Sequence, residues 1–334
     1  MHTNGKKRIT LRHIAQETGY SVNTISKALR NAPDLSATTK EHICSTAQRM
    51  GYVANDMASA LRSGHTNVLA LIISDISNPF FGILCKEIEL QAARYNYTVI
   101  IFNTEEDALR EEHAIRTALS KNVDGVLLTP SQHSASGISL LQKMGKPCVL
   151  IGRYFPMLET DAVLFDDVQG GYLAGSHLIN CGYQNILMLN AAGNTSARDR
   201  AQGFIDAIDQ HSGIKSRIIE LISPLGGCMD VLRQEYVKEP FDAIFAFSDL
   251  LAMEAMCALE QMGIFSGHIG IIGFDDIQSR LAIPKPLTSV GADISLFGMA
   301  LTELLIRRIS GNTEGFPQRI VLPVALNIRT STKK

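Results

Sequence analysis

The hydrophobic positions of this 334-residue chain change character near residue 67. Between residues 9 and 53, apolar residues recur at the three- and four-residue spacing of short helices, and no strand-like run occurs. From Val68 onward, short apolar runs alternate with amphipathic helical stretches. The runs cover residues 68–74, 98–102, 125–128, 147–151, 162–165, 185–189, 242–247 and 269–273, and the helical stretches cover 79–95, 108–121, 169–181, 198–211 and 249–262.

This alternation predicts an α/β fold. Short buried strands separated by helices are typical of a parallel sheet covered by helices on both faces. Eight strands are more than we expect in one sheet of this kind. The charged, turn-rich stretch near 153–161 therefore indicates a division into two lobes. Residues 55–66, which end in Arg62-Ser63-Gly64-His65-Thr66, are expected to link the lobes to the helical start of the chain.

The helical start has the features of a helix-turn-helix. Gly19 stands where a left-handed residue ends a first helix, and Ser21 can cap the next one. A third helix is expected over residues 37–50, capped by Ser36 and stopped at Gly51. The residues expected to face inward are Leu11, Ile14, Ala15 and Thr18 in the first helix and Ile25, Ala28 and Leu29 in the second.

The second helix is expected to turn polar side chains outward, where a recognition helix reads bases. Asn23 can bond to adenine through two hydrogen bonds, Lys27 can reach O6 and N7 of guanine, and Val22 can touch a thymine methyl group. Ser26 and Arg30 lie on the same side or at its flank. The alternative is a generic helical hairpin without a role on DNA.

The charge distribution favours a polyanionic partner for this helical part alone. Residues 1–64 contain nine Lys and Arg against four acidic residues, a net charge of +5. The remaining 270 residues contain 22 basic and 29 acidic residues, a net charge of −7. A small basic head on an acidic body indicates that only the head contacts nucleic acid.

Seven fragments follow one another along the chain in a distinctive order. They are the helix-turn-helix residues from Ile9 to Leu29, Arg49-Met50-Gly51-Tyr52-Val53-Ala54-Asn55, Asp75-Ile76-Ser77-Asn78-Pro79-Phe80-Phe81, Val123-Asp124-Gly125-Val126, Asp166-Asp167 before Gly170-Gly171, Gly270-Ile271-Ile272-Gly273-Phe274-Asp275-Asp276, and Pro286-Leu287-Thr288-Ser289-Val290. Together they resemble the lactose repressor/galactose repressor (LacI/GalR) family of bacterial transcriptional regulators.

The resemblance implies a domain organisation. A helix-turn-helix DNA-binding domain would occupy residues 1–54, and a hinge helix and linker residues 55–66. A periplasmic-binding-protein-like core with parallel sheets would follow. Its N-terminal lobe would comprise residues 67–164 plus 294–320, and its C-terminal lobe residues 165–291 plus 321–334. The chain would form a homodimer that binds a pseudo-palindromic operator in double-stranded DNA, with repression as the expected outcome.

The resemblance also implies which residues contact DNA. In the family, the hinge helix folds in the minor groove and a leucine, here Leu61, wedges into the central base step. The alternative for Leu61 is a small core anchor. Asp56 and Ser59 stand where many relatives have neutral or basic groups. The expected DNA-binding residues are Thr10, Leu11, Arg12, Ser21, Val22, Asn23, Thr24, Ser26, Lys27, Arg30, Asn55, Ala58 and Leu61.

By the same resemblance, a small-molecule effector binds between the lobes. Carboxylates, arginines and phenylalanines at the matching positions suit a polyol. The expected effector is a sugar or sugar phosphate, and the alternative is a nucleobase or nucleoside. Gly152 replaces an aspartate frequent in relatives, and residues 224–227 lack their usual aromatic. The expected effector-binding residues are Asn78, Phe80, Phe81, Ser131, Arg153, Asp166, Arg200, Ser248, Asp249 and Asp275.

Other function classes are less well supported. A solute-binding protein would share the core, but it needs export, and we expect no secretory signal and no membrane-spanning segment. The chain carries no phosphate-binding loop, nucleophile elbow or zinc helix, so we expect neither an enzyme nor a metal or cofactor. Six scattered cysteines fit a reducing cytoplasm.

Overall fold

The computed structural model describes residues 9–53, 64–221, 227–264, 268–281, 284 and 286–333. The chain divides into two compact units, Met1–Thr66 and Asn67–Lys334. Each unit has its own hydrophobic core. Within the described residues, no helix has the length and apolar character that crossing a bilayer requires.

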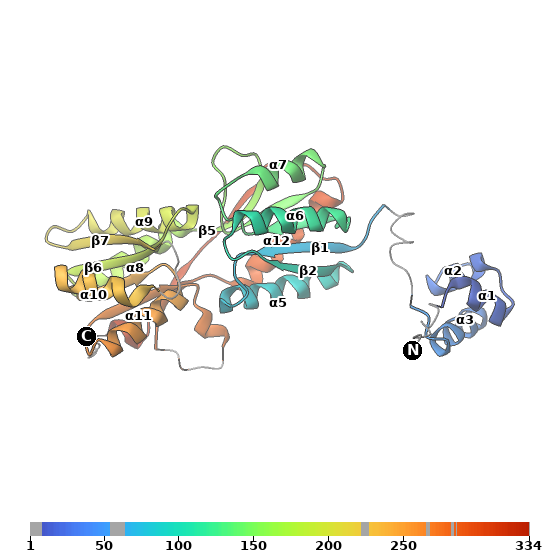
Figure 1. The fold of residues 1–334 in the computed structure, drawn as a ribbon, viewed down its shortest axis with the longest axis horizontal. Helices are drawn as coiled ribbons and strands as arrows, with labels where there is room; N and C mark the ends of the chain where they lie inside the picture. Colours follow the sequence, from blue (N-terminus) through green and yellow to red (C-terminus); the bar gives the residue numbers. More distant parts are fainter. Residues whose placement is uncertain are drawn as a thin grey trace, which may run out of the picture. The chain divides into compact units, whose positions relative to one another are not determined.

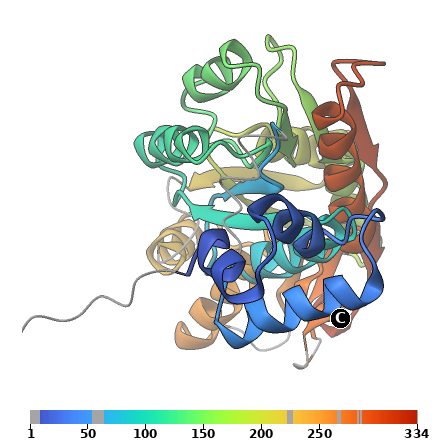
Figure 2. The ribbon, with the colours of Figure 1, turned by 90° about the vertical axis from the view of Figure 1, so that its right-hand side faces the viewer.

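The described residues of the first unit, drawn in blue in Figure 2, form a bundle of three helices: α1 (Leu11–Thr18), α2 (Val22–Leu29) and α3 (Ala37–Arg49). Its core contains Ile14, Ile25 and Ile43, none of which is accessible to solvent. Gly19 ends α1 with a left-handed φ of 74°, and the Ser21 hydroxyl caps α2 by accepting from the backbone N–H of Thr24 at 3.1 Å. The predicted helix-turn-helix is confirmed.

The first lobe of the second unit is a six-stranded parallel sheet between two layers of helices (Figure 1). Its strands, in spatial order, are β11 (Arg319–Leu322), β5 (Asp161–Phe165), β4 (Cys148–Ile151), β3 (Gly125–Leu128), β1 (Val68–Ile73) and β2 (Thr98–Asn103). Alternate residues of β1 face opposite layers. Helices α5 (Pro79–Arg94) and α12 (Ile294–Ile309) cover one face, and α6 (Ala108–Ser120) and α7 (Ser136–Lys143) the other.

The second lobe repeats this three-layer plan. Its strands, in spatial order, are β12 (Ala325–Asn327), β10 (Thr288–Gly291), β9 (Gly270–Phe274), β8 (Ala243–Ala246), β6 (Asn185–Ala191) and β7 (Lys215–Leu221), parallel except for β12. Helices α8 (Asp167–Asn180) and α9 (Thr195–Ile208) cover one face, and α10 (Cys228–Lys238) and α11 (Asp249–Gln261) the other. Two short 3₁₀ turns, η1 (Ile277–Arg280) and η2 (Thr330–Thr332), complete the lobe.

The chain crosses between the lobes three times, from β5 to α8, from β10 to α12 and from β11 to β12 (Figure 1). The expected end of the first lobe at residue 320 therefore falls inside β11. All eight predicted strands are present, and the two-lobed parallel architecture is confirmed.

Four strands and two helices escaped the sequence pattern. β7, β11 and β12 are edge strands: Lys215, Arg217 and Glu220 interrupt the apolar residues of β7, and β11 and β12 have only four and three residues and lie on either side of Pro323. β10 is buried but contains Thr288 and Ser289, whose hydroxyls find partners within the lobe. Helices α7 and α10 lie outside the helical stretches expected from the sequence.

Candidate functional site

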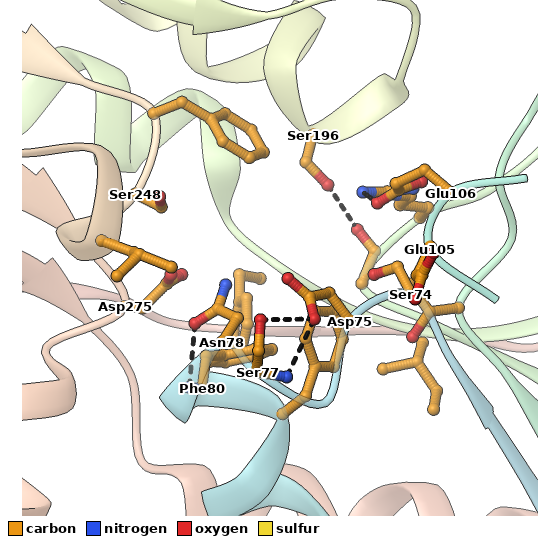
Figure 3. A pocket seen from close by; sticks show the side chains of 18 of the residues that line it. Ser74, Asp75, Ser77, Asn78, Phe80, Glu105, Glu106, Ser196, Ser248 and Asp275 are labelled. Carbon is orange, nitrogen blue, oxygen red and sulfur yellow. Dashed lines mark hydrogen bonds and ion pairs between the residues drawn. The ribbon is translucent and has the colours of Figure 1, made fainter. Parts of the chain in front are cut away.

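A cavity of about 630 Å³ lies between the two lobes. Its walls come from the segments that follow the carboxyl ends of strands β1, β2, β3 and β4 in the first lobe and β8 and β9 in the second, together with the start of α9. Since parallel strands end at a common edge, these segments converge, as in other open α/β sheets that bind ligands. Figure 3 shows the polar side chains that converge on it.

The start of α5 forms one wall of the cavity. Asn78 caps this helix, its Oδ1 accepting from the N–H of Phe80 at 3.1 Å, and Pro79 occupies the first helical turn. Phe80 and Phe81 are both largely buried and meet edge to face, with ring centroids 5.2 Å apart. They therefore belong to the core of the first lobe while also lining the cavity.

Arg200 reaches the cavity from α9 and is held by α8. Its Nε donates to Oδ1 of Asp167 at 2.8 Å, and both side chains are almost fully buried. The guanidinium also stacks on Phe274, 3.5 Å from the ring centroid, and donates to the backbone carbonyl of Phe247. Burial raises the pKa of Asp167 to about 6, although Arg200 acts in the opposite direction.

Arg153 faces the cavity from the first lobe. Its two terminal nitrogens donate to the two carboxylate oxygens of Glu106, each at 2.7 Å, and Nη1 also donates to the carbonyl of Pro130 at 2.8 Å. The preceding Gly152 adopts a left-handed φ of 66°. This conformation favours glycine, which has no Cβ to clash with the backbone.

Asp275 lies at the end of β9 in a left-handed conformation, with a φ of 103°. Such backbone strain is typical of ligand-binding positions. Among the described residues, nothing donates a hydrogen bond to its carboxylate. Burial raises its pKa to about 7, with Arg200 opposing and Asp167 reinforcing the shift. Its carboxylate faces the cavity beside Ser248 (Figure 3) and is available to accept from a ligand hydroxyl.

Seven of the ten expected effector-binding residues line this cavity, and three do not. Asp249 is fully buried behind it, where its oxygens accept from Ser289 Oγ at 2.5 Å and from the N–H of Ile277 at 2.9 Å. Asp166 caps α8. Ser131 is buried beside α6, where its N–H donates to Glu111 at 2.6 Å. The seven that line it are Asn78, Phe80, Phe81, Arg153, Arg200, Ser248 and Asp275.

Sequence reasoning missed several polar residues of the cavity wall. One signal was present, because an acidic run follows the apolar run at 98–102 and must therefore lie at the carboxyl end of that strand. The wall residues missed include Asp75, Ser77, Glu105, Glu106, Asp107, His133 and Ser196.

Hydrogen bonds join the two lobes beside the cavity. Gln132 accepts from the N–H of Thr195 at 2.6 Å, and Ser196 Oγ donates to the carbonyl of Gly152 at 2.8 Å. The Tyr154 hydroxyl donates to Asp199 at 3.0 Å. The first lobe is thus held against the start of α9, which closes one side of the cavity.

In the first unit, the start of α2 presents an exposed face. Val22 and Asn23 are exposed, and within the described residues Asn23 makes no side-chain hydrogen bond. Arg30 is also exposed and donates through Nε to the carbonyl of Ser26. Thr10, Arg12 and Ser21 are exposed as well, and Leu11 and Thr24 are half-buried.

Lys27, on the same helix, is half-buried and already has a partner. Its ammonium contacts Asp34 at 2.5 Å, and this hydrogen bond lowers the pKa of Asp34. Lys27 must therefore leave Asp34 to reach a base. The expected hinge contacts Asn55, Ala58 and Leu61 lie outside the described residues.

Known proteins resemble the chain over nearly its whole length. Residues 66–330 match the family of periplasmic binding proteins and sugar binding domain of the LacI family. The HTH-type transcriptional regulator DegA of Bacillus subtilis (strain 168) is 32% identical over 334 residues, covering 97% of this chain and 98% of DegA.

Two solved structures are similar to this chain. A lac repressor dimer bound to operator and the anti-inducer ONPF shares the fold, with a TM-score of 0.82, 22% identity and coverage of 98% of this chain and 100% of that chain. A LacI family transcriptional regulator from Enterococcus faecium with bound ribose is 28% identical, with a TM-score of 0.69 and coverage of 80% of this chain and 98% of that chain. The chain described here belongs to the LacI/GalR family of transcriptional regulators.

Proposed function

We propose that this protein binds a pseudo-palindromic operator as a homodimer, represses transcription there, and is switched by a small molecule held between its lobes. One observation carries the proposal: a single chain joins a helix-turn-helix with an exposed recognition face to a two-lobed unit with a polar cavity. No catalytic step is part of this function. Because its operator lies on the chromosome, we expect the protein in the cytoplasm.

We assign base recognition to the start of α2. Val22 and Asn23 lie at the N-terminal end of the helix, which enters the major groove in helix-turn-helix proteins. Arg12 and Arg30 are exposed cations on the same unit and are suited to phosphate contacts. Two copies related by the dimer axis would read the two half-sites.

We assign the effector to the class of hydroxyl-rich molecules. The carboxylate of Asp275 can accept from hydroxyl groups, the amide of Asn78 can bond to a further oxygen, and Phe80 offers an apolar surface for C–H groups. The relative from Enterococcus faecium was solved with ribose, which supports this class. Ligand would favour one arrangement of the lobes and thereby alter the affinity for DNA.

Selection of duplexes from a randomised library with the full-length protein tests the regulator function. We expect enrichment of one pseudo-palindromic sequence, bound about 10³-fold or more tightly than a shuffled duplex of equal composition at the same salt concentration. A library that stays random after repeated rounds, although the protein is folded, would contradict the proposal.

A further inference from the structure

The wall of the cavity is rich in negative charge. Among the described residues, the guanidinium groups of Arg153 and Arg200 line it and no lysine does. Five carboxylates of described residues also line it. They are Asp75, Glu105, Glu106, Asp107 and Asp275.

Both guanidinium groups already have carboxylate partners. Arg200 is paired with Asp167 and stacked on Phe274. Arg153 donates from both terminal nitrogens to the two oxygens of Glu106, so neither terminal nitrogen lacks a carboxylate partner. Within the described part of the wall, an anionic ligand group would therefore meet no unpaired guanidinium or ammonium group, and it would face several carboxylates.

The carboxylates differ in how many hydrogen bonds and ion pairs they already accept from the protein. Asp75 accepts from the N–H and the hydroxyl of Ser77, Asp107 caps α6 by accepting from the N–H of Arg110, and Glu105 is ion-paired with the Arg110 side chain. Asp275 has no hydrogen-bond donor among the described residues. These groups can accept hydrogen bonds from hydroxyl or ammonium groups of a ligand, and in their ionised form they repel phosphate and carboxylate groups.

We propose that the effector carries no phosphate or carboxylate group, and that Glu106 is the specificity-determining residue that enforces this by neutralising Arg153. The inference rests on the proposed effector cavity and narrows its ligand to neutral or amine-bearing polyols. Of the two sugar classes suggested by the sequence, it retains free sugars and rejects sugar phosphates.

Glu106, rather than Asp167, is the residue that can be changed selectively. Asp167 and Arg200 are buried together, so removing that carboxylate would leave a charge unpaired inside the lobe. The Glu106 side chain is 40% exposed and lies on the turn after β2, whereas the Arg153 side chain is 9% exposed. Glu106→Gln should consequently fold normally while releasing the guanidinium of Arg153 to the cavity.

Inorganic phosphate is the probe that tests the inference without knowledge of the effector. Binding to the full-length protein is measured by calorimetry and by the shift in Tm, at an ionic strength kept constant with chloride. The four proteins compared are the wild type, Glu106→Gln, Asp107→Asn, and Glu106→Gln combined with Arg153→Gln. Asp107→Asn removes one negative charge from the same turn and keeps a good helix cap, but it frees no guanidinium.

Only Glu106→Gln should gain a phosphate site, with an affinity roughly 10- to 100-fold above that of the other three proteins, as expected for one freed charge-assisted pair. Phosphate bound to the basic first unit would contribute equally to all four. Equal binding by wild type and Glu106→Gln, or a gain that survives in the double variant, would overturn the proposal.

A matched pair of sugars provides the second arm. Wild type should bind D-ribose at least as well as ribose 5-phosphate, and Glu106→Gln should improve only the phosphorylated member. Wild-type preference for ribose 5-phosphate would refute the inference while leaving the DNA-binding function intact. Conversely, failure to select an operator would refute the proposed function without altering the phosphate result.

Discussion

Asn23 is the exposed amide on which base recognition by α2 should depend most. It stands in the first turn of the helix and has no competing side-chain bond among the described residues. Asn23→Ala should weaken binding to the selected operator by ~1–3 kcal/mol and relax base preference at one position of each half-site. Fluorescence anisotropy on single-base operator variants measures this. A variant whose base preferences match those of wild type would exclude Asn23 from readout.

Asp34 holds the ammonium group of Lys27 in an ion pair within the first unit. Because its carboxylate is bonded to Lys27, Asp34→Asn should free the ammonium group and remove a negative charge near the DNA-facing side. DNA affinity should rise, most strongly at low salt, and the slope of log K against log salt should steepen by about 1. Weaker or unchanged binding across the salt series would mean that Lys27 does not reach DNA.

Asp275 makes folding stability depend on pH in a defined direction. Its pKa rises from 3.8 to about 7 in the folded state, so the native protein binds more protons between those values than the unfolded chain. Stability from this group therefore falls as pH rises from about 4 to 7.

Asp275→Asn should remove that dependence, since asparagine tolerates the left-handed backbone and cannot ionise. We expect the variant to be more stable than wild type by roughly 1–3 kcal/mol at pH 8, with the difference shrinking toward pH 5. Urea unfolding at both pH values measures this. A difference that is constant with pH would contradict the assigned protonation.

At the scale of elements, α8 and α9 approach so closely that their backbones touch. A Cβ on Gly203 would lie 1.8 Å from the carbonyl oxygen of Val168, and one on Gly171 would lie 2.0 Å from that of Arg200. This contact brings Asp167 and Arg200, which are 33 residues apart, within hydrogen-bonding distance. The position of Arg200 in the cavity thus depends on the two glycines.

Gly203→Ala should force the helices apart and lower the free energy of unfolding by ~3 kcal/mol or more. The matched control is Gly82→Ala in α5, where an added Cβ meets no atom within 4 Å and helix propensity should raise stability by up to about 1 kcal/mol. The midpoints of denaturant unfolding of the two variants and the wild type measure this difference. Similar stabilities of the two variants would contradict the close packing.

These elements also indicate how far the sequence could be interpreted unaided. Buried strands such as β1 were predictable because their runs are continuously apolar, whereas the edge strand β7 carries Lys215, Arg217 and Glu220. Helix caps such as Ser21 depend only on neighbouring residues, so they could be predicted from the sequence. The pairing of Arg153 with Glu106 spans 47 residues, so it depends on sheet order that periodicity does not encode.

At the scale of the whole molecule, the lobes contact one another through polar bonds, the ion pairs of Arg280 with Glu87 and Asp293, and an apolar patch. Gln132 and Tyr154 bond to α9 beside the cavity, and Ile277 and Met253 of the second lobe join the core of the first. A ligand bound between the lobes contacts residues of both, so it can favour one of their arrangements. The three chain crossings join the lobes covalently, so a movement of one lobe acts on the other through all three.

The central claim is that the cavity controls the DNA affinity of the helix-turn-helix. The most direct test is an anisotropy titration of full-length protein on its selected duplex, with and without a saturating concentration of the free sugar or amine-bearing polyol that most raises its Tm. We predict that the Kd for DNA changes by about 5- to 150-fold, and that operator changes the ligand affinity by the same factor. An unchanged Kd for DNA with the cavity saturated would contradict the account.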